Sequence, residues 1–363
     1  MRSYVKVKYN ECTRTESLTA DCESFSWTDC ASGSADTMTL TLSNITGKWF
    51  KGYYPDSKDN IQTWIVVEDW PVEATVKKKV KVVKKGTKTG TAKLKTTKKA
   101  TKKKNEQKVY CGKFAIDSLH FSGSPEELEL SGISVPISSG FNVSQHSRTW
   151  KKTSVKRILQ AIAKRYGISL QYGAADHKID SVSQSGQTDL DFICSLCSEY
   201  DIALKIYNSK IVTYSKTAYE KKTAKHTINK GDEESYNIDS ECLKKCNSVK
   251  IQYTSGKKKK TLTYQFTRPK TKGTRQLFVT TKAESIADAE KKAKAALREN
   301  IRGCISVNIT LTGNIKYLAA DNVNLKGFGK KLDGKYFIDE VTHERSGGKY
   351  TTQITMHPCV TDF

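Results

Sequence analysis

Two hydrophobic periods follow one another in the segment 186–216, where apolar side chains recur first at helical spacing and then at every second position. Thr188 precedes the helical part and can accept hydrogen bonds from the free amides of a first turn. Asp189 and Asp191 would lie in that turn, at the positive end of the helix dipole. The pattern predicts a capped helix followed by a β-hairpin that turns at 208–210.

The same arrangement occurs once before along the chain. Thr153 is the predicted cap of the earlier helix, and Gly167 supplies a left-handed residue at its end. The segments 165–172 and 199–207 are similar in sequence. Two copies are too few for a solenoid. They therefore predict one compact inserted α/β domain over 148–222.

Alternating apolar and polar residues dominate both sides of this insert and predict strands. The predicted strands are 24–28, 37–42, 62–67, 111–121 and 128–134 before the insert, and 247–253, 261–266, 305–311, 321–327, 335–343 and 350–356 after it. One helix is predicted over 283–300, with Ser285 or Thr281 as its cap and small apolar residues on one face. The chain is therefore predicted to be β-rich α+β.

A lysine-rich segment at 77–108 interrupts the first group of strands. It holds fifteen lysines and one acid, Glu106, and so carries much of the formal net charge of +24. Strand patterns resume after it, which predicts an elongated loop between two strands of one domain. Two alternatives stay open for its conformation: a solvated arm, because like charges repel, or an ordered arm that docks on an acidic partner.

The lysines of this loop are the predicted partner-binding residues. They are Lys77, Lys78, Lys79, Lys81, Lys84, Lys85, Lys98, Lys99, Lys102, Lys103 and Lys104. Lysine tracts also bind phosphate backbones without sequence preference, so a nucleic-acid-binding protein is an alternative. The loop has no Phe, Trp, Tyr or Arg, whose stacking contributes to single-strand binding, and this disfavours that alternative.

Residues 187–216, QTDLDFICSLCSEYDIALKIYNSKIVTYSK, resemble the inserted domain of contractile-tail hub proteins. These are the late control protein D of phages and the hub part of the VgrG spike of type VI secretion. Their pattern is Gln-Thr-Asp-x-Asp-Phe, an apolar helix and a strand. Residues 321–356 resemble the end of the family's second barrel. Asp36, ahead of the strand that begins near Met38, matches the opening of the first barrel.

The resemblance covers 110–363 well and 1–75 weakly, and it does not cover the lysine loop. It implies two tube-like β-barrels, at 1–145 and 225–363, around the inserted domain at 148–222. The loop 77–108 would belong to the first barrel and the helix 283–300 to the second.

The function that the resemblance implies is that of a structural baseplate hub of a contractile tail or injection system. Such a hub is a homotrimeric adaptor that joins the sixfold tail tube to the threefold spike. The implied partners are the tail tube protein, a separate spike protein, baseplate wedge or peripheral proteins and the tape measure protein. The implied location is a phage virion or tail-like particle, assembled in the bacterial cytoplasm. Neither a signal peptide nor an apolar run long enough for a membrane span is predicted.

No catalytic motif accompanies these patterns, because a Gly-x-Ser-x-Gly elbow, a His-Glu-x-x-His pair and a P-loop are all missing from the sequence. We therefore expect no enzymatic activity and no cofactor. A cell-wall hydrolase of a tail is the alternative, with His343 beside Glu340 and Glu344 as its base. The pattern favours a packed histidine at this position instead.

The cysteines allow one metal-binding alternative. Cys194, Cys197, Cys242 and Cys246 could form a four-thiolate zinc site by their spacing. However, the first two lie within the predicted helix, with Cys197 on its apolar face. Buried, reduced thiols without metal are therefore predicted.

Overall fold

The computed structural model describes residues 2–10, 14–56, 59–68, 106–135, 140–241, 243–255, 261–269 and 273–363. The predicted lysine contacts between 77 and 104, and Cys242, lie outside these residues. The described part is β-rich with a few helices, which confirms the predicted β-rich α+β class. Among the helices of the described ranges, none combines the length and apolar character needed to cross a membrane.

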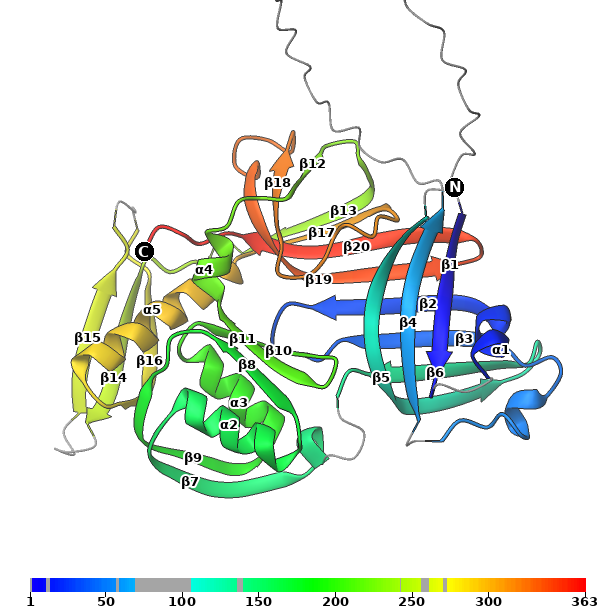
Figure 1. Cartoon of the computed structure of the whole chain (residues 1–363). Helices are drawn as coiled ribbons and strands as arrows, with labels where there is room; N and C mark the ends of the chain where they lie inside the picture. The colour runs from blue at the N-terminus through cyan, green and yellow to red at the C-terminus, as the bar shows by residue number, and fades with distance from the viewer. Residues whose placement is uncertain are drawn as a thin grey trace, which may run out of the picture.

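The N-terminal half of the main sheet wraps around one core. Its strands lie in the order β1 (Arg2–Tyr9), β4 (Asn60–Glu68), β5 (Glu106–Ser122), β6 (Glu127–Ile133), β3 (Thr37–Ser43) and β2 (Cys22–Cys30), and helix α1 (Arg14–Asp21) packs on β1. The first part of β5 pairs with β4 and its second part with β6. Register shifts in both pairings let this long strand bend, so β1 and β4 cross the direction of β2 and β3 in Figure 1.

The same sheet continues into the C-terminal half of the chain, because β19 (Gly334–Ser346) pairs with β2. Beyond it lie β20 (Lys349–Pro358), β17 (Ile305–Thr312) and β13 (Glu233–Ser240), while β18 (Asn322–Lys326) and β12 (His226–Asn229) branch from the other side of β19. This half has its own core, with Val307, Ile309 and Ile354 fully buried. Two regions far apart in the sequence thus share one sheet.

The insert forms a separate layer below this sheet in Figure 1. It contains the pair β7 (Gln145–Ser154) and β9 (Lys178–Thr188), the sheet β10 (Ile202–Tyr207), β11 (Lys210–Ser215) and β8 (Ser169–Gly173), and the helices α2 (Val155–Arg165), α3 (Asp189–Ser198) and α4 (Lys216–Glu220). Short 3-10 turns lie at Lys48–Phe50 and Gly140–Asn142.

Two local predictions for the insert are confirmed and one is wrong by one residue. Thr188 accepts a hydrogen bond from the Asp191 amide, as predicted for the cap of α3. The hairpin turn is confirmed at Asn208 and Ser209, which both have positive φ. The predicted cap of α2 is wrong by one residue: Ser154, not Thr153, accepts from the Arg157 amide. Both residues carry a hydroxyl, but only Ser154 directly precedes the first helical turn.

The helix predicted over 283–300 is α5 (Ile286–Arg302), and its place differs from the prediction. It covers a separate three-stranded sheet of β14 (Ser248–Ser255), β15 (Thr261–Thr267) and β16 (Gln276–Ala283) instead of joining the second barrel. The physical reason is that Val249 and Ile251 point to one face of β14 and need an apolar cover. Ala293 and Leu297 of α5 provide it, so β14–β16 and α5 form a unit with its own core.

Candidate functional site

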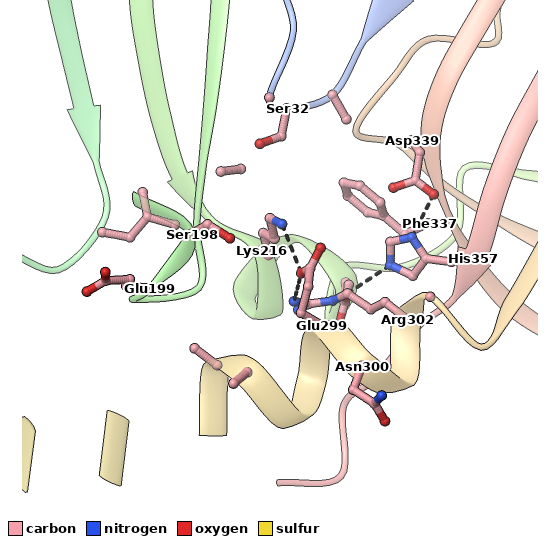
Figure 2. A pocket seen from close by; sticks show the side chains of 18 of the residues that line it. Ser32, Ser198, Glu199, Lys216, Glu299, Asn300, Arg302, Phe337, Asp339 and His357 are labelled. Carbon is pink, nitrogen blue, oxygen red and sulfur yellow. Dashed lines mark hydrogen bonds and ion pairs between the residues drawn. The ribbon is translucent and has the colours of Figure 1, made fainter. Parts of the chain in front are cut away.

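A cleft of about 1090 Å³ lies where the insert, the α5 unit and the main sheet meet. Figure 2 shows that its side chains come from all three: Ser198 and Lys216 from the insert, Glu299 and Arg302 from α5, and His357 from β20. The cleft is therefore a junction, and its chemistry depends on how these charges are paired.

Glu220, at the end of α4, is the central residue of this junction and is 1% exposed. Its Oε1 accepts from Arg302 Nε at 2.5 Å and lies 3.2 Å from His357 Nε2, and its Oε2 accepts from the Val360 amide at 3.1 Å. Burial alone would raise the pKa of Glu220. The hydrogen bonds from His357 and Arg302 outweigh it and hold the pKa below its usual value.

His357 lies between two carboxylates. Its Nδ1 is 2.7 Å from Asp339 Oδ2, opposite the Glu220 contact. Burial disfavours the imidazolium, but the two acceptors outweigh burial and raise the pKa of His357 to about 9. The ring is therefore charged at neutral pH and donates to both carboxylates.

Arg302 joins α5 to the insert. Its Nη1 donates to Asp201 at 2.5 Å and to Glu299 at 3.3 Å, and Lys216 pairs with the same Glu299 at 3.0 Å. Each carboxylate that lines the cleft thus has a cation within ion-pair distance, including Glu199 with Lys292 at 2.7 Å. Such an arrangement suits a structural junction better than a catalytic site, because a general base needs a carboxylate free to accept a proton.

A second ion cluster joins the insert to the N-terminal half of the sheet. Lys205 of β10 forms ion pairs with Asp29 and Asp36, at 3.1 Å for the latter, and donates to the Cys30 carbonyl at 2.9 Å. Asp36 is fully buried and also accepts from the Cys30 amide at 3.0 Å. Burial raises the pKa of Asp36 to about 7, although Lys205 acts in the opposite direction. Asp36, the aspartate of the first-barrel motif, therefore contributes to the contact between the insert and the N-terminal half of the sheet.

The Gln-Thr-Asp motif has a related role inside the insert. Asp189 is fully buried and accepts from Arg165 Nη1 at 2.5 Å, Tyr166 OH at 2.7 Å and Gln184 Nε2 at 2.8 Å. The motif residue therefore ties the start of α3 to the end of α2 and to β9. These contacts add to its position in the first turn of α3, which the sequence predicted.

His343 is a packed residue, as the sequence pattern favoured. It is fully buried in β19, its Nε2 lies 3.2 Å from the Tyr317 carbonyl oxygen, and its Nδ1 lies 2.8 Å from Tyr350 OH. Burial lowers the pKa of His343 to about 4, so the ring is neutral. Glu344 is exposed on the opposite face of the strand. This geometry does not suit the hydrolase alternative.

The described cysteines are free thiols. Cys197 is buried within α3, and burial raises the pKa of Cys194 to about 11, so both thiols are protonated at neutral pH. Within the described ranges, no group of His, Cys, Asp and Glu side chains has the geometry to hold a metal ion.

Strands β4 and β5 lie at the two ends of the lysine segment. β4 and β5 pair antiparallel up to Glu68 and Glu106, which directly oppose each other. Residues 69–105 therefore connect two neighbouring strands, and residues 106–108 of the predicted loop 77–108 belong to β5 instead.

The outward side of six neighbouring strands forms one continuous polar surface, which we call the hydroxyl face. Figure 1 shows these strands side by side. Its members are Ser24, Ser26 and Thr28 of β2; Thr37, Thr39, Thr41 and Ser43 of β3; Glu127, Glu129 and Ser131 of β6; Ser306, Asn308, Thr310 and Thr312 of β17; Glu340, Thr342, Glu344 and Ser346 of β19; and Thr351, Gln353 and Thr355 of β20. Their apolar neighbours point inward to the two cores. Sequence reasoning identified the strands but not this common surface, since it depends on the pairing of β2 with β19.

Comparison with known proteins identifies this architecture. A family model described as YQBQ-like matches residues 141–357. No curated protein sequence matches the chain. The tail protein from Neisseria meningitidis MC58 is similar in structure, with a TM-score of 0.66, 13% identity, and coverage of 98% of this chain and 97% of that chain.

Two further solved structures share the fold. The 43 kDa tail protein of prophage MuSo2 from Shewanella oneidensis has a TM-score of 0.66 and 10% identity, over 98% of each chain. The E. coli c3393 protein is described as a component of the type VI secretion system with structural similarity to the T4 bacteriophage tail proteins gp27 and gp5. It has a TM-score of 0.52 and 11% identity, over 99% of this chain and 78% of that chain. At these identities the likeness establishes the fold.

Proposed function

Because the chain belongs to the YQBQ-like family and has the fold of phage tail proteins, we propose that it is a structural component of a contractile tail or injection system. Its specific role in this proposal is that of the baseplate hub, similar to late control protein D and to the hub part of VgrG. The proposal includes no enzymatic activity.

The observation that carries the proposal is the pairing of β2 with β19, which joins two halves with separate cores into one sheet. A tail tube has sixfold symmetry and its spike has threefold symmetry, so a connecting protein must match both. Three copies of a chain with two tube-like halves present six halves to the tube and three equivalent surfaces to the spike. A homotrimer therefore resolves the mismatch.

The domains take different roles in this arrangement. The halves within 1–145 and 225–363 form the ring, with the tube protein on one side and the spike on the other. The insert at 148–222 lies outside the ring, where exposed Lys156, Arg157 and Lys164 can contact spike or wedge proteins. The lysine loop at 77–108 docks on an acidic partner in the particle. The particle is assembled in the bacterial cytoplasm.

Copy number tests the proposal directly. The complex with the tube or spike partner should have a mass that includes three chains of 40.6 kDa each, by native mass spectrometry or by quantifying chains in purified particles. One or six copies per particle would be incompatible with the adaptor role. A matched variant, Lys205→Met, should weaken the contact between insert and sheet without changing the number of copies, since its side chain lies within one protomer.

A further inference from the structure

Strand β16 forms one edge of the three-stranded sheet that α5 covers. It pairs with β14 in an unbroken parallel register, and among the described strands none pairs with its other side. Figure 1 shows β16 at the side of this sheet nearer the insert. The backbone N–H and C=O groups along that side therefore have no strand to bond to.

The composition of β16 does not protect this edge. Natural edge strands commonly carry charged residues, a proline or a bulge, which hinder pairing with other chains. The strands at the ends of the main sheet, β1 and β13, have three charged residues each: Arg2, Lys6 and Lys8, and Glu233, Glu234 and Asp239. In β16 the only charged residue is Lys282, near the end of the strand, and the register has no shift. Such an edge is suited to accept another strand.

The junction cleft lies beside β16. Leu277, Val279 and Thr281 point to the side of the sheet that α5 covers, and all three line the cleft. They are only half-buried. Short side chains from two helices line the cleft with them: Ala295 and Ala296 of α5, and Ser195 and Ser198 of α3. The cleft therefore has room for apolar side chains next to the free edge. The opposite edge strand, β15, also lacks charged residues, but none of its residues lines the cleft.

Two contacts close the edge at one end. Lys292 Nζ donates to the Lys282 carbonyl at 2.8 Å, and the amide of Asp180, from the insert, donates to Glu284 Oε1 at 3.0 Å. The open stretch is therefore 276–281, which is about 20 Å long at ~3.3 Å per residue. This length matches one ordinary strand of about six residues.

The charges of the cleft favour a neutral occupant. Its carboxylates are already paired with cations: Glu220 with Arg302, Asp339 with His357, Glu299 with Lys216 and Glu199 with Lys292. An ionic ligand would have to displace one of these pairs. A polypeptide backbone is neutral, and it presents donors and acceptors at the spacing of a neighbouring strand.

We propose that an extended segment of a different protein of the particle adds to β16 as a fourth strand and places alternate apolar side chains in the cleft. Main-chain hydrogen bonds along 276–281 supply affinity, and the cleft selects the side chains at every second position. A second copy of this chain fits less well. Two β16 strands paired antiparallel are related by a twofold axis, which a trimeric ring lacks. The choice of a different protein therefore rests on the proposed hub.

Hydrogen exchange of the backbone amides tests the proposal in purified particles. We expect the segment 276–281 to exchange about tenfold or more slowly in particles than in the isolated chain, because its outward amides donate to the added strand. β15 is the internal control and should exchange at the same rate in both states. Unchanged exchange at 276–281 in particles with three copies of the chain would overturn the inference and leave the hub intact. Equal slowing in β15 would indicate general burial and would also contradict it.

A substitution in the cleft tests the side-chain contacts. Ala296→Arg fills the cleft from α5, and we expect it to lower the yield of particles by about tenfold. The matched control is Ala287→Arg, on the exposed side of the same helix and outside the cleft, which should give the parental yield. Thermal unfolding of both isolated chains checks that they fold. Parental yield from Ala296→Arg would contradict the proposal. If this variant does not fold, the exchange measurement on parental particles decides.

Copy number and the oligomeric state of the isolated chain separate this inference from the proposed hub. Slow exchange at 276–281 in particles with a copy number other than three would reject the hub and keep the added strand. A dimer of the isolated chain in which 276–281 already exchanges slowly would identify a second copy as the occupant, and this would overturn the inference.

Discussion

The imidazole of His343 stacks on the indole of Trp27 with 5.2 Å between the ring centroids and an interplanar angle of 14°. The two residues directly oppose each other in the pairing of β19 with β2. Trp27 belongs to the core of the N-terminal half, and His343 lies in β19, the strand of the C-terminal half that pairs with β2. The stack therefore stabilises the joint on which the continuous sheet depends.

Removal of this ring should destabilise the protein. His343→Ala leaves a cavity beside Trp27 and removes an acceptor from Tyr350 OH, and we expect a loss of about 3 kcal/mol in the free energy of unfolding. Urea unfolding followed by Trp fluorescence measures the change. His343→Phe keeps the stacking surface and should cost less than His343→Ala. Equal losses in the two variants would show that ring stacking contributes little.

His343 also predicts the direction in which the free energy of unfolding changes with pH. The pKa of His343 is about 4 in the folded protein, below the usual value of 6.5, so the unfolded chain binds more protons between these values. The neutral ring of His343 therefore contributes to the free energy of unfolding above pH 6.5, and this contribution is lost as pH falls towards 4. The unfolding free energy should rise from pH 4.5 to 6.5 in the parent and rise less in His343→Phe. Identical slopes in both proteins would contradict the assignment.

His357 should give the opposite dependence. Its pKa is raised to about 9, so the folded state holds its proton more tightly than the unfolded chain. The contribution is fully present below pH 6.5 and is lost as pH rises through 9. We expect the unfolding free energy to fall between pH 7 and 9 in the parent and to fall less in His357→Gln. A parental slope in that variant would assign the effect to other groups.

Much of the secondary structure could be predicted because its signals are local. The alternation in 37–42 and 305–311 coincides with β3 and β17, and the hydroxyl of Thr188 marks the start of α3. β9 was not predicted because it has few apolar residues and is stabilised by its partner β7. In the sheet that α5 covers, the strands 247–253 and 261–266 were predicted and β16 was not, and the separation of this sheet from the main sheet was not predicted, since periodicity identifies an apolar face but not what it packs against.

The junction could not be predicted for a different reason. Glu220 and Arg302 are far apart in the sequence, and a charged residue is expected to be exposed unless its partner is known. One weak signal exists: Arg302 directly follows Ile301, the last residue of the apolar stripe of α5, and so lies beside the buried side of this helix. Nothing in the local pattern identifies Asp201 or His357 as its neighbours.

Loss of the central carboxylate should destabilise this junction. Glu220→Gln removes the buried carboxylate that Arg302 and His357 share and leaves them only Asp201, Glu299 and Asp339 as partners, and we expect a loss of about 3 kcal/mol in the free energy of unfolding. Denaturant unfolding measures it. In a double-mutant cycle, Arg302→Met should cost less in the Glu220→Gln background than alone, because the pair has already been weakened. Additive losses would indicate that the two residues act independently.

Deletion of residues 78–107 tests the lysine loop separately from the fold. The deletion removes Glu106 and Gln107, the first two residues of β5, but it keeps the β4–β5 ladder from the Val66–Lys108 pair onwards, and residues 69–77 remain to connect the two strands. We expect parental thermal unfolding from the shortened chain, since the cores of both halves are complete without the loop. Yield of complete particles should fall, because the deletion removes thirteen lysines and one glutamate, a net charge of +12 that docks on an acidic partner. Replacement of the same lysines by glutamine keeps the loop length and should lower the yield equally. Normal yield from both variants would exclude a docking role, and normal yield from the glutamine variant alone would assign the role to loop length instead of charge.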